Sequence, residues 1–273
     1  MNYLTLKDIQ NEETKILRKT IDYFNSHNIK YYLWGGTLLG AVRHQGFIPW
    51  DDDIDIIVPR PDYDKLINLM KKNNEIADNY EAIEFQLGNA DTPYCKIINK
   101  NIELEINNQI DKHLWIDVFC LDGVPDDYES YFKRVKMNKH IFAYKRYRDK
   151  RLLTDKSLKK RFIKKIIFFP YEFISLKKVT EKLIDFHKKY DYEKANYFGN
   201  TIWGSERSVL KKEWLEKDIL LDFSGIKANT FSGYKNYLEK FYGNDYMELP
   251  PENKRITHLF KAWRVDNETK TNK

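Results

Sequence analysis

Apolar residues recur every three or four positions near the start of the chain. The spacing from Ile9 to Phe24 is helical, and Thr5 followed by Asp8 is a capping signal for a helix N-terminus. The pattern stops at a Ser-His-Asn triplet, so we predict a helix over about 6–26.

A short apolar and aromatic run follows at 29–34 and ends at Gly35-Gly36. Such a run predicts a buried strand that enters a tight turn. Thr37 is then placed to cap a short helix that extends through Val42. The predicted local order is therefore strand, Gly-Gly turn and helix.

Apolar and acidic residues alternate in the segment DDDIDIIVP at 51–59. A period of two predicts a strand that carries Asp53 and Asp55 on one face, and Pro61 suits the first turn of the helix after it. Helices and strands are thus mixed, and both α/β and α+β orders remain open. Further strands are predicted at 82–87, 94–98, 102–106 and 114–119, with a hairpin turn at 99–101.

The pattern from 128 to 190 is helical and basic. At about 100° per residue, most apolar side chains of 158–169 fall on one side of a helix and most lysines and arginines on the other. Such a two-faced helix suits either packing on a core or shallow contact with a surface. The last third is mixed, with a helix predicted at 232–242 and a loop at 242–251.

The composition limits the class of protein. With 42% hydrophobic residues among 273, the chain can bury a core, so wholesale disorder is excluded. The length suits one large domain or a core with an added subdomain. Cys95 and Cys120 have no second pair, so neither a disulfide framework nor a cysteine zinc site is expected. The first residues lack signal-peptide character and no apolar run is long enough to span a bilayer, which predicts a cytoplasmic protein.

The net charge of +6 hides two segments of opposite sign. Residues 1–132 hold 13 basic and 23 acidic residues, whereas residues 133–189 hold 20 basic and 5 acidic ones. The acidic part is a poor nucleic-acid surface, but it can bind cations where its carboxylates converge. The basic segment indicates an anionic partner.

The aspartate cluster at 51–55 has three interpretations. A solvated acidic loop is common, but Asp55 continues directly into an apolar strand, where an unpaired charge is costly. An EF-hand calcium loop would need glycine and glutamate where the chain has Ile56 and Asp62. The remaining interpretation is Mg²⁺ held between carboxylates and the phosphates of a substrate.

Two other features are suited to a phosphate-transfer site. Gly35-Gly36 lets backbone amides approach a phosphate next to a helix N-terminus, although a plain tight turn is the commoner use of such a pair. Asp117, within the strand predicted at 114–119, is either a hydrogen-bonded structural group or a third carboxylate. Three converging carboxylates would form a two-metal site for phosphoryl transfer.

Residues 34–63, WGGTLLGAVRHQGFIPWDDDIDIIVPRPDY, resemble the signature of the LicD family, and the stretches 114–122 and 242–264 are also similar to that family. The resemblance implies an α+β protein with a mixed-sheet nucleotidyltransferase core of the polymerase-beta type. The site positions that it implies are Gly35, Gly36, Asp53, Asp55 and Asp117.

We expect three parts in the chain. The nucleotidyltransferase core spans 1–127, a basic helical subdomain spans 128–198, and a helical C-terminal region at 199–273 closes over the active site.

In LicD members that act on choline, phosphocholine passes from CDP-choline to a sugar hydroxyl of a teichoic acid, lipopolysaccharide or capsule precursor, and CMP is released. The resemblance therefore implies a CDP-activated donor, a glycan acceptor that we expect to be lipid-linked, and two Mg²⁺ or Mn²⁺ ions on Asp53, Asp55 and Asp117. Phosphoethanolamine, glycerol-phosphate and ribitol-phosphate are alternative groups. A non-catalytic, membrane-associated scaffold of glycan assembly is an alternative from another class.

Residues between the glycines and the aspartates are candidates for supporting roles. Arg43 and His44 either bind the donor phosphate or face water at a helix C-terminus. Trp50, Asp51 and Asp52 are expected to orient the loop that carries the metal ligands.

The quaternary ammonium of choline would need an aromatic cage, because it cannot donate hydrogen bonds. Trp34, Trp50 and Trp115 are near the predicted site in the sequence, although aromatic residues at strand ends more often belong to the core.

Four basic residues near the C-terminus are a further candidate group. Positions 258, 261 and 264 have the spacing of one helix face, which either contacts a substrate phosphate or is simply an exposed basic end. The group consists of Arg255, His258, Lys261 and Arg264.

The basic segment at 133–189 has two candidate anionic partners. The glycan substrates that the resemblance implies make RNA the weaker one. The inner surface of an anionic membrane fits better, with the apolar side of 158–169 inserted shallowly. Packing of that side on the catalytic core is the alternative.

Overall fold

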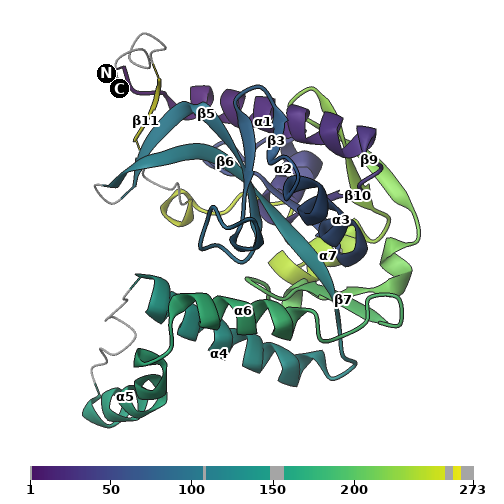
Figure 1. Cartoon of the computed structure of the whole chain (residues 1–273). Coiled ribbons are helices and arrows are strands. Elements are labelled where there is room, and N and C mark those ends of the chain that lie inside the picture. The colour runs from purple at the N-terminus through teal and green to yellow at the C-terminus, as the bar shows by residue number, and fades with distance from the viewer. Residues whose placement is uncertain (1, 107–108, 148–156, 256–260, 266–273) are drawn as a thin grey trace, which may run out of the picture.

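The computed structural model in Figure 1 describes residues 2–106, 109–147, 157–255 and 261–265. It confirms the predicted α+β class. The helices are α1 (Leu6–Ser26), α2 (Gly35–His44), α3 (Arg60–Met70), α4 (Tyr128–Tyr147), α5 (Leu158–Glu172), α6 (Leu176–His187) and α7 (Tyr234–Tyr242). The strands are β1 (Tyr32–Leu33), β2 (Asp55–Pro59), β3 (Glu75–Ala77), β4 (Tyr80–Ile83), β5 (Cys95–Ile106), β6 (Gln109–Val124), β7 (Tyr197–Asn200), β8 (Leu210–Lys211), β9 (Asp218–Phe223), β10 (Ile226–Phe231) and β11 (Lys261–Arg264).

Nine of the described strands form one mixed sheet, whose main path has the order β1-β2-β6-β5-β4-β3. β2 is parallel to β6, whereas β1 with β2 and β5 with β6 are antiparallel pairs. β9 and β10 form a separate antiparallel pair. The parallel pair at the centre brings two strands that are distant in the sequence side by side.

Helix α1 begins where the capping signal predicts. The Thr5 hydroxyl accepts a hydrogen bond from the Asp8 N–H at 3.2 Å, and the Asp8 carboxylate accepts one from the Thr5 N–H at 3.0 Å. The apolar face of the helix, including Ile16, Leu17 and Phe24, is buried in a core that the sheet shares with α2, α3 and α7. The helices predicted near 6–26 and 232–242 are both confirmed.

The hairpin turn predicted at 99–101 is wrong. β5 runs without a break through these residues, and the chain reverses only after it. Asn99 and Glu103 face consecutive residues of β6, so the polar stretch between them forms a bulge. The Asn99 side chain accepts the N–H of Asn101 at 3.0 Å, which satisfies the bulged backbone inside the strand.

The strand predicted at 82–87 is only partly correct. β4 ends at Ile83, and residues 85–87 form a 3₁₀ turn. The buried Glu84 carboxylate accepts the N–H of Gln86, and this local bond stabilises the turn in place of a strand.

Helices α4, α5 and α6 lie beside the sheet, and we call them the basic arm (Figure 1). They correspond to the helical pattern predicted at 128–190. A small hydrophobic cluster joins Phe142 and Tyr144 of α4 to Phe168 of α5 and Leu183 of α6. In the described ranges, no helix is both long and apolar enough to cross a membrane.

Candidate active site

Two aspartates and a lysine lie in register across three adjacent strands. Asp55 of β2 is opposite Asp117 of β6, and Asp117 is opposite Lys96 of β5. Directly opposite residues project from the same face of a sheet, so these three side chains lie together. The Lys96 ammonium is 2.6 Å from an Asp117 carboxylate oxygen. The predicted placement of Asp53 inside the strand is wrong, because β2 begins only at Asp55.

Negative charge accumulates around Asp55, which is half-buried. Burial raises the pKa of its carboxyl well above the usual value, and the carboxylates of Asp53, Asp117 and Asp51 raise it further. Lys96 opposes this shift. We call Asp51, Asp53, Asp55 and Asp117 the acidic centre. Its electrostatics favour a bound cation or proton beside Asp55.

The Gly-Gly turn lies directly against these carboxylates. Gly35 has a left-handed φ of +53°, and a Cβ placed there would be 3.3 Å from an oxygen of Asp55. A Cβ on Gly36 would be only 2.9 Å from an oxygen of Asp51. Because side chains here would crowd the acidic centre, the glycines leave bare backbone beside it.

Thr37 joins the turn to β2 and does not cap a helix. The Thr37 hydroxyl accepts a hydrogen bond from the Asp55 N–H at 2.8 Å, and the Asp55 carbonyl accepts one from the Trp34 N–H at 3.1 Å. The predicted capping role is wrong because α2 begins earlier, at Gly35. Both bonds fix the position of Asp55 relative to the turn.

Helix α1 supplies two polar side chains to this region, and the sequence reasoning missed both. Glu13 is 1% exposed, and its Oε2 atom has no hydrogen-bond partner. Burial raises the pKa of its carboxyl well above the usual value, with the Asp53 carboxylate as the next cause. Gln10 donates a hydrogen bond to the Asp51 carbonyl at 2.8 Å. Glu13 follows Ile9 by four residues, so helical periodicity could have revealed it on the buried face.

Arg43 and His44 lie in the last turn of α2, and Arg43 contacts the loop after α7. Arg43 donates hydrogen bonds to the carbonyls of Tyr246 and Glu248 at 3.0 and 2.9 Å, and its Nε donates to the His44 ring at 3.0 Å. Burial and the adjacent guanidinium lower the pKa of His44. In this structure Arg43 therefore anchors the loop at 242–251 to α2.

All three tryptophans considered for a choline cage contact another side chain of the protein, and Trp34 and Trp50 contact residues of the C-terminal region. Trp34 is buried and stacks on Tyr237 of α7, with ring centroids 4.5 Å apart. The Arg255 guanidinium lies 4.6 Å from the centroid of the half-buried Trp50 ring. Arg255 thereby brings the C-terminal region to the loop that carries Asp52, which is itself buried.

Trp115 is the tryptophan that lies beside the aspartate pair. It precedes Asp117 by two residues on β6, so both side chains project from the same face. The Lys96 ammonium is 3.9 Å from the centroid of the Trp115 ring, in a cation–π contact. At the end of α7, burial and then the Asp55 carboxylate raise the pKa of the Tyr242 phenol.

The helical face predicted for the C-terminal basic residues is wrong. Lys261–Arg264 form β11, which is antiparallel to β5, and strand geometry does not align positions three apart. His258 lies outside the described residues. Arg264 points to α1, where its guanidinium is 2.8 Å from Glu12.

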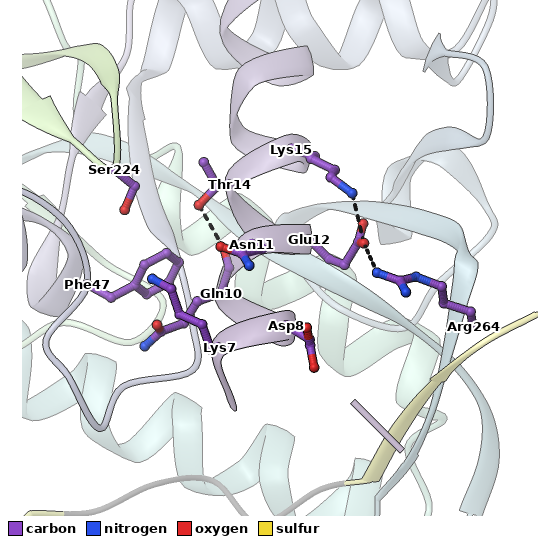
Figure 2. Close-up of a pocket in the computed structure, with 10 residues that line it drawn as sticks. All are labelled: Lys7, Asp8, Gln10, Asn11, Glu12, Thr14, Lys15, Phe47, Ser224 and Arg264. Carbon is purple, nitrogen blue, oxygen red and sulfur yellow. Dashed lines mark hydrogen bonds and ion pairs between the residues drawn. The ribbon is translucent and has the colours of Figure 1, made fainter. Parts of the chain in front are cut away.

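Arg264 also lines a groove along α1, shown in Figure 2. The groove has a volume of about 610 Å³ and is mainly polar, with Lys15 and Glu12 joined at 2.9 Å on one wall. Phe47 and Ser224 form its other side. The groove therefore follows the outer surface of α1.

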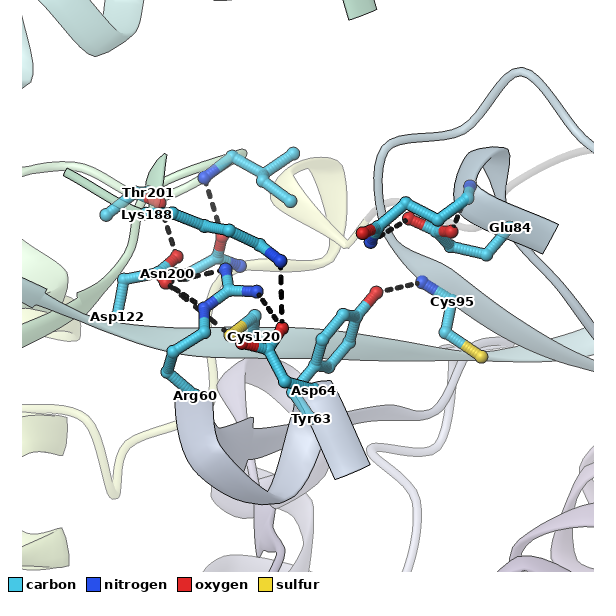
Figure 3. Close-up of polar contacts among 12 residues, drawn as sticks. Arg60, Tyr63, Asp64, Glu84, Cys95, Cys120, Asp122, Lys188, Asn200 and Thr201 are labelled. Atoms are coloured by element: carbon cyan, nitrogen blue, oxygen red, sulfur yellow. Dashed lines mark hydrogen bonds and ion pairs between the residues drawn. The ribbon is translucent and has the colours of Figure 1, made fainter. Parts of the chain in front are cut away.

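A second polar cluster lies five residues further along β6, at Asp122 (Figure 3). This carboxylate is buried and accepts hydrogen bonds from Arg60 of α3 at 2.6 Å and from the Thr201 hydroxyl at 2.7 Å. Nearby, Lys188 pairs with Asp64 at 3.1 Å. Since every charge here has a protein partner, the cluster is a structural link between α3, the sheet and the end of α6.

The acidic centre fits a metal ion that also binds a substrate. Among the residues that the structure describes, no group of three or more His, Cys, Asp or Glu side chains is arranged to hold a metal by itself. Mg²⁺ commonly uses one or two carboxylates and takes its remaining ligands from water and phosphate oxygens. Asp55 and Asp117, side by side next to the bare Gly35 backbone, match that donor set.

Comparisons with known proteins agree on one group of relatives. The LicD/FKTN/FKRP nucleotidyltransferase domain matches residues 28–121, which include the Gly-Gly turn and the aspartate pair. The lipopolysaccharide cholinephosphotransferase LicD of Haemophilus influenzae is 30% identical over 267 residues, covering 94% of this chain and 97% of that protein. The human ribitol 5-phosphate transferase FKRP is 44% identical over 46 residues, which are 15% of this chain and 9% of that protein.

Proposed function

Because the chain belongs to the LicD family, we propose that it transfers a phospho-group from a nucleotide-activated donor to a hydroxyl of a glycan. The observation that carries this proposal is the pairing of Asp55 with Asp117 beside Gly35. Phosphoryl transfer depends chiefly on positioning and on neutralising phosphate charge. An acidic pair that can hold cations next to a backbone that can approach a phosphate supplies both.

Phosphocholine from CDP-choline is the group that we favour. The extended likeness to a cholinephosphotransferase supports it. The Trp115 ring near Asp117 also supports phosphocholine. This ring already contacts an ammonium group, because the Lys96 ammonium lies 3.9 Å from its centroid. A quaternary ammonium binds an aromatic face by the same attraction. We therefore assign choline recognition to Trp115 ahead of Trp34, which is stacked and buried.

Asp53, Asp55 and Asp117 would hold two Mg²⁺ or Mn²⁺ ions, which supply charge neutralisation to the donor diphosphate when they are bound. The backbone amides of the Gly35-Gly36 turn and the α2 N-terminus would bind the donor phosphates. Lys96 would keep the Asp117 carboxylate in place through their ion pair.

In the proposed reaction the acceptor oxygen forms a bond to the phosphorus that carries choline. The bond between that phosphorus and the bridging oxygen breaks, and CMP leaves with this oxygen. The hydroxyl proton passes to a carboxylate of the Asp55–Asp117 pair. The reaction needs no covalent enzyme intermediate.

The donor can be identified by thermal shift and by CMP release. We would screen CDP-choline, CDP-ethanolamine, CDP-glycerol and CDP-ribitol with Mg²⁺, because a donor that binds the folded state raises its melting temperature. We expect the largest shift and metal-dependent CMP release with CDP-choline and a glycan acceptor. A chain that binds no donor and releases no CMP would instead be a scaffold.

Ribitol-phosphate is the second candidate group. The local likeness to a ribitol 5-phosphate transferase supports it, and that likeness covers a short part of the chain. Preference for CDP-ribitol in the same screen would favour this donor. It would also argue against choline recognition by Trp115.

A further inference from the structure

Helix α5 exposes its apolar side. Leu158, Phe162, Ile166 and Phe169 are 78%, 66%, 57% and 62% exposed. Phe173, directly after the helix, is 77% exposed. Soluble surfaces rarely display so many large apolar side chains together, so this side of α5 is suited to contact with another apolar phase.

The helix is attached to the rest of the molecule by its opposite side. Phe168 is the buried residue of α5, and its ring stacks on Tyr144 of α4 with centroids 4.9 Å apart. At about 100° per residue, Phe168 falls among the lysines and the arginine rather than among the other apolar residues. The orientation is therefore the reverse of a helix that packs its apolar side on a core.

Basic residues border the exposed apolar side. Lys160 lies near one edge and Arg161 and Lys165 near the other, while Lys159 lies within the apolar side, and all four are exposed. The sequence from 158 to 171 contains no acidic residue. Long basic side chains at such positions can extend to headgroup phosphates while their stems cover apolar surface.

We propose that α5 docks the protein on an anionic lipid bilayer. The exposed apolar side chains insert at the level of the acyl-chain boundary, and the bordering lysines and arginine bind headgroup phosphates. A second copy of the chain is a poor occupant, because pairing two α5 helices would bring together two segments that each hold 20 basic and 5 acidic residues. A nucleic acid would satisfy the charges but leave the apolar side chains in water.

Figure 1 places α5 at the far end of the basic arm, away from the strands that carry the acidic centre. Docking through α5 therefore leaves the proposed active site uncovered. The inference goes beyond the proposed function, because vesicle binding is measured without a donor or an acceptor.

Flotation of the full chain with lipid vesicles tests the proposal. One set of vesicles contains phosphatidylcholine only, and the other contains about 30% phosphatidylglycerol. We expect flotation with the anionic vesicles at low salt, little flotation with the neutral ones, and a marked loss at high salt because headgroup attraction is screened. Absence of the protein from both lipid fractions would overturn the proposal.

Matched variants distinguish binding through the apolar side chains of α5 from nonspecific hydrophobic adsorption to the vesicles. Phe162→Ser with Phe169→Ser should weaken binding to anionic vesicles by about tenfold or more. The control pair Leu220→Ser with Met247→Ser also removes exposed apolar side chains, but outside α5, and should bind as the parent does. All four residues are at least half exposed, so the melting temperatures should stay near that of the parent. Equal binding by the parent and the α5 pair would contradict the proposal.

Charge variants test the contribution of the basic residues of α5 to vesicle binding. Lys160→Gln with Lys165→Gln should weaken binding by about fivefold for each charge removed, whereas Lys217→Gln with Lys235→Gln should not. Analytical ultracentrifugation completes the test. A dimer that dissociates when Phe162 and Phe169 are replaced would show that a second copy covers α5, and the membrane proposal would then be wrong.

Discussion

The acidic centre and the basic arm differ in how their charged side chains are positioned and in how far they are exposed to solvent. In the acidic centre, carboxylates from β2 and β6 are brought together by strand register, and one of them pairs with Lys96 at 2.6 Å. On α5 the charges remain in solvent, and the apolar side chains are exposed with them. Buried charges depend on a fixed geometry, whereas exposed charges act through a field that salt screens.

The proposed function and the proposed membrane docking assign different tasks to these two regions of the chain. The centre of the sheet can perform chemistry that requires side chains to be fixed in register. The arm can locate the protein on a surface, a task that tolerates movement. Substitutions in the acidic centre should therefore abolish turnover without changing vesicle binding, and substitutions on α5 should do the reverse.

The largest effect is expected for the aspartate pair. Asp55→Asn or Asp117→Asn removes a charge that the metal and phosphates would require, so turnover should fall by about a thousandfold. The folded state should survive, because each change leaves a residue of the same shape. CMP release measures the first effect and the thermal melt the second. Asp78→Asn, at an exposed position outside the acidic centre, is the control. Near-normal turnover in either variant would remove the pair from the mechanism.

A smaller effect is expected at the Gly-Gly turn. Gly35→Ala places a methyl group 3.3 Å from an Asp55 oxygen on a left-handed residue. The strain should cost about 1 kcal/mol, and the displaced carboxylate should lower turnover by about tenfold to a hundredfold. Gly88→Ala is a matched control, because Gly88 also has a positive φ, of +76°, and a Cβ there meets nothing within 4 Å.

Denaturant melts and CMP release on both glycine variants separate strain from chemistry. Both should lose similar stability, and the Gly35 variant alone should lose turnover. Equal turnover losses would mean that the turn acts through the stability of the fold.

The next effect is expected at Lys96, which joins Asp117 to the Trp115 ring. Lys96→Gln should lower turnover by about tenfold, because the Asp117 carboxylate loses its charged partner, and Lys96→Arg should restore part of it. The Mg²⁺ dependence of turnover is the discriminating measurement, since a purely structural lysine would leave it unchanged.

The site shows which kinds of information a single sequence carries. The Gly-Gly turn and the aspartates at 51–55 are short local patterns, so the sequence alone was sufficient to single them out as candidates, although Asp53 precedes β2 and does not lie within it. The pairing of Asp117 with Lys96 depends on the register of β5 and β6, which the sequence does not encode locally. The wrongly predicted turn at 99–101 belongs to the same strand, where a bulge accommodates polar residues that otherwise favour a reversal.

The fold class was predictable for a related reason. Long amphipathic segments such as α1 reveal their type through periodicity, whereas short elements depend on tertiary partners. β11 is such an element, since Lys261 and Arg264, which were predicted to lie on one helix face, belong to a strand that pairs with β5. Which side of α5 faces solvent was the feature hardest to predict from the sequence. An amphipathic pattern states that a helix has two sides, and only the contact of Phe168 with Tyr144 decides which side faces inward.

The smallest effect is expected for two adjacent glutamates of α1, whose pKa values shift in opposite directions. Burial raises the pKa of Glu13 well above its usual 4.5. Burial would raise that of Glu12 too, but hydrogen bonds from Arg264 and Lys15 lower it below the usual value. A raised pKa means that the folded state retains a proton that the unfolded state releases. Glu13 therefore costs stability as the pH rises from about 4.5 through its folded pKa.

Glu13→Gln should accordingly raise the melting temperature at pH 8 and have little effect at pH 4. Glu12→Gln should lower the melting temperature at pH 8. A lowered pKa means that the Glu12 carboxylate stabilises the fold at a pH above its usual pKa, and this stability disappears as the pH falls through the folded pKa. That loss should stay below about 1 kcal/mol, since Arg264 and Lys15 are largely exposed and solvent screens them. Calorimetry of both variants across pH 4–8 measures the difference. If added Mg²⁺ removes the gain from Glu13→Gln, a cation at the acidic centre also stabilises the Glu13 carboxylate. A gain that persists in Mg²⁺ would place Glu13 outside the field of the metal.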